Sequence, residues 1–200
     1  MSMRTRQKTV PRQTTASGAG NSASSLEKNL ILVIDGHDSA GKTTLSRRLA
    51  RDMKADYLRP FGGEKGTAML EAAESGKFQE AARLAHEMVD RVLSQSSSSI
   101  KVLDRHWMTV LTLLPEALWN QWLPPPPTFL CWVDIDVTLA RIHARWERHY
   151  PRSWHLKYIH RYLDLAKRFE VPILRTDNTS VSDASAQLHL WALTHLKDQP

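Results

Sequence analysis

Residues 30–44 read LILVIDGHDSAGKTT, a short apolar run followed directly by a polar, glycine-containing loop. The loop fits the pattern G-x-x-x-x-G-K-[ST], in which backbone N–H groups surround phosphates, the lysine reaches the β and γ phosphates, and the hydroxyl holds Mg²⁺. The positions that match are Gly36, Gly41, Lys42 and Thr43. The sequence therefore predicts a nucleotide-phosphate site in this loop.

The segments on either side of the loop have the periodicities that such a site requires. The run from Leu30 to Ile34 is typical of a strand buried on both faces of a parallel sheet. After the loop, Leu45, Leu49 and Met53 recur at every fourth position, which predicts an amphipathic helix. The amino end of that helix would point at the bound anion.

A second apolar run, from Ile100 to Leu103, ends in Asp104, Arg105 and His106. A carboxylate at the end of a buried strand beside the loop can bind Mg²⁺ directly or through water, and the neighbouring guanidinium can hold a second anion. This pattern predicts an acceptor phosphate beside the donor, which favours a kinase over a GTPase or a mechanical ATPase. No segment resembles the base-recognition motif of a GTPase.

Length and charge indicate one domain with a basic extension. The chain has 200 residues, which favours a single domain of ordinary size. Its net charge is 27 − 21 = +6, and residues 1–28 contribute 5 − 1 = +4 of it. Because residues 1–28 are rich in Ser, Thr, Gly and Ala, we expect a flexible basic arm ahead of a kinase domain at 29–200. A solvated tail, a polyanion-binding arm and an organellar transit peptide all stay open for this arm.

Cys131 is the only cysteine, which excludes an intrachain disulfide framework and a zinc site built on cysteine pairs. No apolar run approaches the roughly 18 residues of a membrane span, and residues 1–28 lack the apolar segment of a secretory signal. We expect a soluble, cytoplasmic protein without a membrane partner, located in the host cytoplasm if its source is viral.

Arginines recur in the segment VTLARIHARWERHYPR, at positions 141, 145, 148 and 152. On a helix with 100° per residue they fall within about 60° of one another, and the apolar side chains fall on the opposite side. A solvated basic face is the usual explanation for such a stripe. Beside a phosphate-binding loop, however, we expect Arg141, Arg145 and Arg148 to close over the phosphates, where an arginine contributes roughly 10³ to 10⁵ in rate. Pro151 is expected to end this helix, so Arg152 belongs to the stripe less securely.

From about Leu30 to its end, the chain resembles the thymidylate kinase family of P-loop nucleotide kinases. DGHDSAGKTT is similar to that family's E-G-x-D-G-x-G-K-T loop, and VLDRH is similar to its D-R-Y element. Residues 128–145 resemble the family's following strand and lid helix, and residues 172–180 resemble the strand that leads to its adenine loop. The resemblance implies an α/β fold of three layers, with a central parallel sheet and an arginine-rich lid helix.

The resemblance also implies roles for individual residues. Asp38 would lie between donor and acceptor, close to the metal and the attacking oxygen, and the segment from Thr176 to Thr179 would lie near the adenine. Arg59, in YLRPFGGEKG, would correspond to an arginine that holds the acceptor phosphate.

The chain departs from the family's pattern around the acceptor. The family's T-R-E-P-G-G segment is matched only loosely by YLRPFGGEKG, because the glutamate before the proline is absent. His106 and Trp107 replace the tyrosine and its neighbour, and residues 108–119 supply few of the polar side chains that the family uses around thymine.

The motifs and the resemblance together assign candidate residues to four roles. Catalysis is assigned to Lys42, Asp38, Asp104, Arg105, Arg141 and Arg145. ATP binding is assigned to Gly36, His37, Asp38, Ser39, Ala40, Gly41, Lys42, Thr43, Thr44, Arg141, Arg145 and Arg148. Acceptor binding is assigned to Arg59, Arg105, His106 and Trp107, and Mg²⁺ binding to Thr43 and Asp104.

Several other side chains have an ordinary structural interpretation. The histidines at 143, 149, 155 and 160 lack the pairing with a carboxylate that a metal site shows, so we expect solvated or packed rings. Three tryptophans, at 107, 119 and 122, are expected in the core, with stacking on a nucleobase as the alternative. The apolar spacing of residues 78–93 predicts a helix that covers one face of the sheet.

The simplest function is the ATP- and Mg²⁺-dependent transfer of the γ-phosphoryl group to a thymidine-like deoxynucleotide, as in a dTMP kinase. A second hypothesis makes the acceptor the hydroxymethyl group of 5-hydroxymethyluracil within DNA, as in viral kinases that resemble this family. The basic arm, the altered thymine segment and the surplus of tryptophans motivate it. A third is a nucleotide-binding regulatory protein without catalysis, which the presence of Lys42 and Asp104 disfavours. The sequence leaves open the acceptor, the choice of ATP or GTP, and the oligomeric state, a homodimer included.

Overall fold

The computed structural model describes residues 29–145 and 150–197. The expected basic arm at 1–28 and the lid arginine Arg148 lie outside these residues. Within the described part of the chain, no helix combines the length and the apolar character needed to cross a membrane.

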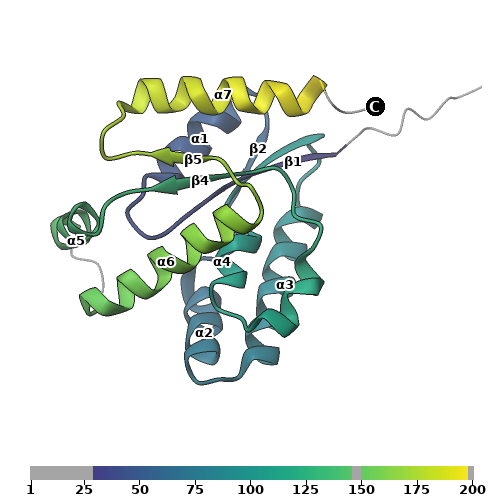
Figure 1. Cartoon of the computed structure of the whole chain (residues 1–200). Helices are drawn as coiled ribbons and strands as arrows, with labels where there is room; N and C mark the ends of the chain where they lie inside the picture. Colours follow the sequence, from purple (N-terminus) through teal and green to yellow (C-terminus); the bar gives the residue numbers. More distant parts are fainter. Residues whose placement is uncertain (1–28, 146–149, 198–200) are drawn as a thin grey trace, which may run out of the picture.

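A five-stranded sheet, parallel throughout, forms the centre of the molecule (Figure 1). In spatial order the strands are β2 (Asp56–Leu58), β3 (Ile100–Asp104), β1 (Leu30–Asp35), β4 (Thr128–Trp132) and β5 (Ile173–Arg175). β1 and β3 are the strands expected from their apolar runs, and Leu32, Ile34 and Val102 in them are fully buried. The parallel sheet with buried central strands is confirmed.

Helices cover both faces of this sheet, which makes the three layers (Figure 1). On one face lie α1 (Lys42–Asp52) and α7 (Val181–Lys197). On the other lie α2 (Gly63–Glu74), α3 (Phe78–Ser94), α4 (Trp107–Leu111), the 3-10 helix η1 (Glu116–Trp122) and α6 (Arg152–Arg168). The remaining helix, α5 (Ile135–Ala144), follows β4. Each face therefore has its own apolar core, with α1 and α7 over one and α2, α3, α4 and α6 over the other.

The register of the sheet brings the predicted site residues together at the carboxyl ends of the strands. Ile34 of β1 is aligned with Asp104 of β3, so the ends of the two strands and the loop after β1 lie together. Parallel strands with helical connections present their carboxyl ends at the same edge, where ligands bind in open α/β sheets. The two apolar runs of the sequence thus bring the loop and the Asp104 motif side by side.

α3 differs in part from its prediction. The helix forms, but its buried side chains include Ala82 and Val89, whereas Leu84 and Val92 are only partly buried. α3 packs closely against α2, so its apolar stripe faces a neighbouring helix as well as the core beneath the sheet. Apolar residues at helical spacing show that one face of a helix is buried. They do not show whether a sheet or another helix covers that face.

Candidate active site

The loop after β1 has the backbone conformation that phosphate binding needs. Gly36 has φ of 139°, and a Cβ atom there would lie 2.1 Å from the Cys131 carbonyl oxygen, so only glycine fits. Gly41 has φ of 80° and immediately precedes α1, whose first residue is Lys42. The loop therefore wraps the amino end of a helix, where unpaired N–H groups favour an anion.

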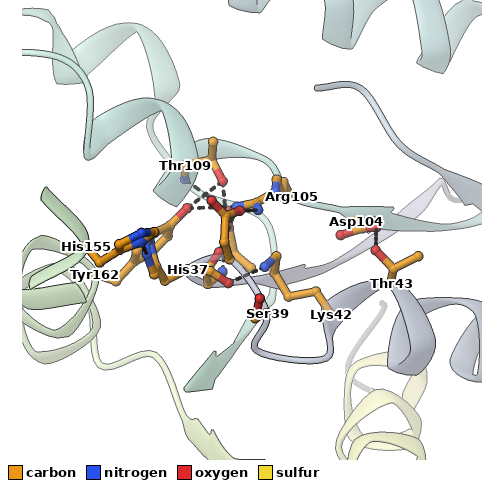
Figure 2. A network of polar contacts seen from close by, with 12 residues as sticks. His37, Ser39, Lys42, Thr43, Asp104, Arg105, Thr109, His155 and Tyr162 are labelled. Carbon is orange, nitrogen blue, oxygen red and sulfur yellow. Dashed lines mark hydrogen bonds and ion pairs between the residues drawn. The ribbon is translucent and has the colours of Figure 1, made fainter. Parts of the chain in front are cut away.

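Lys42 lies inside this loop, with only 5% of its surface exposed. Its Nζ donates a hydrogen bond to the carbonyl oxygen of His37 across the loop (Figure 2). Burial, with a contribution from the neighbouring Arg105, lowers the pKa of Lys42 to about 8, although the carboxylates of Asp38 and Asp104 oppose the shift. An anion bound in the loop would favour the charged ammonium, because opposite charges raise the pKa of a lysine.

Thr43 and Asp104 meet at the start of α1. The Thr43 hydroxyl donates to Asp104 Oδ2 at 2.6 Å, and the Tyr57 hydroxyl donates to the same oxygen at 2.9 Å. Hydroxyl and carboxylate oxygens are the hard ligands that Mg²⁺ prefers, and Mg²⁺ keeps several waters and substrate phosphates in its shell. Among the described residues no group of three or more His, Cys, Asp or Glu side chains could hold a metal by itself. The pair fits a metal shared with a phosphate, and Tyr57 is a partner that the sequence did not predict.

Arg105 is bonded to the loop after β1 at two points. Its Nη1 donates to the Gly36 carbonyl oxygen at 2.8 Å, and its Nη2 donates to Asp38 Oδ1. Burial alone would raise the pKa of the Asp38 carboxyl, but the adjacent guanidinium and Lys42 outweigh it and hold this pKa below its usual range. Asp38 is therefore an anion, paired with a cation that keeps its orientation.

A buried polar network of side chains from β1, α4 and α6 lies next to Arg105. Asp35 is fully buried and accepts hydrogen bonds from the backbone N–H groups of Gly36 at 2.8 Å and Thr109 at 3.1 Å. The Thr109 hydroxyl lies 2.7 Å from both Asp35 Oδ1 and the Tyr162 hydroxyl. Arg105 Nη1 lies 3.4 Å from the same Tyr162 oxygen. The sequence analysis assigned none of Asp35, Thr109 and Tyr162 to the site.

The lid arginines reach the loop from α5. Arg141 donates to the Ser39 carbonyl oxygen at 2.9 Å and to the Thr176 carbonyl oxygen at 3.3 Å. Arg145 donates to the Ser39 hydroxyl. Both guanidinium groups thus lie against the phosphate loop, at the side where Thr176 Oγ1 donates to the Ala40 carbonyl oxygen at 3.0 Å.

The lid helix is shorter than its prediction. α5 ends at Ala144, where Arg145 N–H bonds back to the Ile142 carbonyl oxygen and closes the last turn. Arg152 was grouped with the same stripe, but it is the first residue of α6, and its guanidinium pairs with Asp136 on the exposed surface. The regular spacing of the arginines therefore extends across two helices, and Arg152 does not face the loop.

Three hollows form a continuous cleft along this edge of the sheet. The first lies between the loop, α5 and α7 and is lined by Thr44, Arg141, Thr176 and Thr179. The middle one follows the loop, and the third, of about 260 Å³, lies between α2, α4 and α6. The first and middle hollows share Ser39, Gly41, Thr44 and Arg145, and the middle and third share Asp38, Thr67, Leu70 and Arg105. Asp38 and Arg105 therefore stand at the junction with the third hollow, which we call the acceptor pocket.

The middle hollow gathers most of the cationic candidates. It is lined by Lys42, Arg59, Arg105 and Arg145, with Asp38 as its carboxylate. Arg59 is exposed at the end of β2, on the opposite side of the hollow from α5. This arrangement can bind several phosphate groups in one line.

His106 and Trp107 were assigned to the acceptor, and the structure does not bring their side chains to the acceptor pocket. Trp107 is fully buried, its indole N–H donates to Thr128 Oγ1 at 2.7 Å, and its ring packs edge-on against Phe169. The His106 ring packs edge-on against Trp122, with a ring-centre distance of 5.6 Å. Burial lowers the pKa of His106 to about 4. α4 begins at Trp107, so these two side chains turn into the core as the chain leaves β3.

The acceptor pocket instead takes its walls from residues to which the sequence assigned no role. Phe61, Met69 and Leu113 form apolar walls, and α6 contributes Trp154, Tyr158 and Tyr162. The signal in the sequence was the spacing of residues 154, 155, 158 and 162, which places these side chains on one face of a helix. Nothing in that spacing distinguished a pocket wall from an ordinary core stripe.

Fold and loop together define a P-loop protein of the nucleoside and nucleotide kinase fold class. Solved structures agree: a deoxyadenosine kinase from M. mycoides, with dCMP and dCDP bound, matches with a TM-score of 0.54 and 13% identity over 82% of this chain and 100% of that one. The YorR protein from Bacillus subtilis, in complex with phosphorylated GDP, matches with a TM-score of 0.56 and 15% identity over 82% of this chain and 97% of that one.

Within this class the chain is thymidylate kinase-like in sequence. It is 33% identical to the thymidylate kinase of Xanthomonas euvesicatoria pv. vesicatoria (strain 85-10), over 58% of this chain and 62% of that protein. The thymidylate kinase of Xanthomonas oryzae pv. oryzae (strain PXO99A) is 32% identical over 58% of this chain and 61% of its own length. The match thus spans less than two thirds of these relatives, and no family model matches the chain.

Proposed function

We propose that the protein is an ATP- and Mg²⁺-dependent kinase that transfers the γ-phosphoryl group to a pyrimidine deoxynucleoside monophosphate, dTMP being the simplest acceptor. The observation that carries this proposal is the Arg105–Asp38 pair, which lies where the middle hollow meets the acceptor pocket. The sequence relatives named thymidylate kinase support it.

The donor half of the proposal rests on the loop and its partners. The backbone amides of residues 37–43 and the Lys42 ammonium would bind the triphosphate. Arg141 and Arg145, which already contact Ser39, would hold it from the α5 side. The hollow bounded by Thr176 and Thr179 would receive the adenine, as the resemblance to thymidylate kinases implies.

The metal half rests on Thr43 and Asp104. When bound there, Mg²⁺ would neutralise charge on the β and γ phosphates as it develops. Thr43 Oγ1 would be a direct ligand, and Asp104 would bind the ion directly or through water. Tyr57 would hold the Asp104 carboxylate in place through its hydrogen bond to Oδ2.

A monophosphate acceptor explains the cations that the donor does not need. Arg59 and Arg105 line the middle hollow on the side away from α5, close to the opening of the acceptor pocket. Guanidinium groups bind phosphate through paired, charge-assisted hydrogen bonds. A phosphate held between them would lie in line with the donor, and its base would extend between Phe61 and the aromatic side chains of α6.

Catalysis then follows from position and charge. The phosphate oxygen of the acceptor needs no base to remove a proton, so the protein has to align the two phosphates and stabilise the charge that spreads over the transferred group. Lys42, Arg105 and Arg145 would supply that stabilisation from three sides. The Asp38 carboxylate would orient Arg105, through the bond between them.

The test is a transfer assay with γ-labelled ATP and Mg²⁺. The acceptors to compare are dTMP, dCMP, dUMP, thymidine, and oligonucleotides with and without 5-hydroxymethyluracil. Label on dTMP that is lost in an Asp38→Asn variant supports the proposal. Label on the oligonucleotide in place of dTMP would establish the DNA-kinase hypothesis instead, and label on thymidine would indicate a nucleoside kinase. Tight ATP binding without label on any acceptor would favour the regulatory hypothesis.

The exposed Asp52 offers a matched control for Asp38. Asp52 pairs with Arg51 on the outside of α1, away from the cleft. An Asp52→Asn variant should transfer phosphate at the parental rate, because an exposed ion pair contributes little. Equal loss in the two variants would show that the effect of Asp38 is not local to the cleft.

A further inference from the structure

A pair of histidines connects the phosphate loop to α6. His37 Nε2 lies 2.8 Å from His155 Nδ1, and the two rings meet edge to face with a ring-centre distance of 5.1 Å (Figure 2). His155 is 1% exposed and His37 is 7% exposed. This contact joins residues 118 positions apart, and the proposed transfer mechanism does not use either ring.

The two rings are neutral at physiological pH. Burial, with smaller contributions from Lys42 and Arg105, lowers the pKa of His37 to about 3, although the Asp38 carboxylate opposes the shift. Burial also lowers the pKa of His155. A neutral pair shares one proton between Nε2 and Nδ1, and each ring keeps a single further nitrogen for another partner.

His37 lies in the wall of the acceptor pocket. It lines that pocket together with Asp38 and Trp154. Its Nε2 is occupied by His155, whereas among residues 29–145 and 150–197 its Nδ1 makes no hydrogen bond and is not one of the buried polar atoms that lack a partner. The main chain of His37 serves the donor side at the same time, because its carbonyl oxygen accepts the hydrogen bond from Lys42.

We propose that the His37 ring binds the acceptor nucleotide through Nδ1, and that His155 is a positioning residue that holds this ring against the pocket. The inference rests on the proposed function and adds a contact to it on the acceptor side. A neutral imidazole contributes a directional hydrogen bond without adding charge beside Arg105. Its effect is therefore expected on acceptor affinity more than on the rate of transfer.

His155 also has a purely structural interpretation, in which it only ties α6 to the loop. The two interpretations differ in which kinetic constant changes. If His155 only connects α6 to the loop, its removal would disturb the loop and therefore both ATP binding and turnover. Loss of a positioning contact would raise the KM for dTMP and leave the KM for ATP close to its parental value.

Kinetic variants of His155 separate these cases. His155→Phe keeps an aromatic ring but removes the hydrogen bond, and His155→Gln restores a polar group that can reach His37. We expect His155→Phe to raise the KM for dTMP about tenfold, as for the loss of one well-placed hydrogen bond, and His155→Gln to recover most of it. His160, exposed on the same helix, provides the control His160→Phe, which should match the parent. Equal increases in both KM values, or no rescue by Gln, would overturn the proposal.

A second measurement does not depend on turnover. In protein labelled with ¹⁵N-histidine, addition of dTMP should shift the His37 Nδ1 resonance while the His160 resonances stay in place. The shift without any label transfer would refute the proposed function and leave this contact standing. Binding of dTMP, seen by calorimetry, with an unmoved His37 resonance would refute the contact even if the protein is a dTMP kinase.

Discussion

The donor side and the acceptor side of the cleft are constructed differently. The donor side comes mostly from one continuous stretch, because β1, the loop and α1 follow one another within residues 30–52. The acceptor pocket is assembled from α2, α4 and α6, and its hydrogen bonds join distant residues such as Thr109 and Tyr162. Local backbone geometry therefore fixes where phosphates bind, whereas tertiary packing decides what is bound beside them.

The two sides also differ in chemistry. Among the described residues, the hollow beside α5 and α7 is lined by hydroxyl groups, aliphatic side chains and two arginines, and by no aromatic ring. The described part of the acceptor pocket wall includes rings from His37, Phe61, Trp154, Tyr158 and Tyr162. If the donor base binds in the first hollow, as proposed, its aliphatic and hydroxyl walls would tolerate different bases, whereas an acceptor bound between rings would be selected by shape. Substrate selectivity should therefore depend on changes in α6 more than on changes in the loop.

Lys42→Met should give the largest effect, a loss of phosphoryl transfer without a loss of acceptor binding. Removal of one preorganised cation from the transferred phosphate costs about 10² to 10³ in kcat. Binding of dTMP, measured by calorimetry, should stay within twofold of the parent, because the Lys42 ammonium bonds to the His37 carbonyl oxygen inside the loop and the proposed ligands of the acceptor phosphate are Arg59 and Arg105. Lys77→Met is the control, since Lys77 is exposed before α3. A Lys42→Met protein that retains more than a tenth of parental kcat would contradict the assignment of the loop.

The sequence predicted the parts of the site that depend on local structure and missed the parts that depend on tertiary packing. The loop, the two central strands and the Asp104–Thr43 pair follow from short motifs, because their geometry is local or comes from the register of adjacent strands. Tyr57, Thr109 and Tyr162 had no such motif. They reach the site only because β2, α4 and α6 pack where they do, and packing depends on the whole chain.

Acid should lower the free energy of unfolding through two buried histidines. His37 and His106 have pKa values lowered by burial to about 3 and about 4, whereas an unfolded histidine titrates near 6.5. Below pH 6.5 the unfolded chain therefore binds more protons, and the free energy of unfolding falls as the pH falls. From pH 6.5 to 5.0 the loss is about 2 kcal/mol for each ring.

Urea unfolding at pH 7.5 and pH 5.0 measures this loss. Of the groups facing His37, Asp38, Lys42 and Arg105 keep their charge states over most of this interval, because the Asp38 pKa lies below it and those of Lys42 and Arg105 lie above it. Burial also lowers the pKa of the fourth group, His155, so its protonation would change the free energy of unfolding in the same direction. The midpoint should be clearly lower at pH 5.0. Equal free energies of unfolding at the two pH values would mean that these rings are solvated and not held neutral by burial.

Arg141→Met should give an intermediate effect, confined to the donor. Arg141 contacts the Ser39 and Thr176 carbonyl oxygens on the α5 side, and a bound triphosphate would lie between them. We expect the KM for ATP to rise about tenfold, as for one charge-assisted hydrogen bond, with the KM for dTMP unchanged. Arg152→Met is the control, since its guanidinium pairs with the exposed Asp136. A change in the KM for dTMP alone would place Arg141 on the wrong side of the cleft.

The predicted lid shows why a periodic pattern can mislead. Arg141 and Arg152 are in phase on one ideal helix, yet the chain divides this segment between α5 and α6. Periodicity reports which residues would share a face if the helix continued, and it cannot report where the helix ends. The same limit applies to His106 and Trp107, whose place next to Arg105 in the sequence said nothing about the direction of their side chains.

Two tryptophan variants give the smallest expected effects and test the boundary of the acceptor pocket. Trp107→Phe removes the bond to Thr128 from the core and should lower the free energy of unfolding by about 1 kcal/mol, which lowers Tm by roughly 2–4 °C. The KM for dTMP should not change, because Trp107 does not line the pocket.

Trp154→Phe is the opposite case: the indole lines the pocket and donates to Glu74 at the end of α2. It should raise the KM for dTMP several-fold with a similar or smaller loss of Tm. An increase in KM from Trp107→Phe would instead mean that the tryptophan next to Arg105 stacks on the acceptor base, and the acceptor would then have to lie across α4, in a different place from the pocket beneath α6.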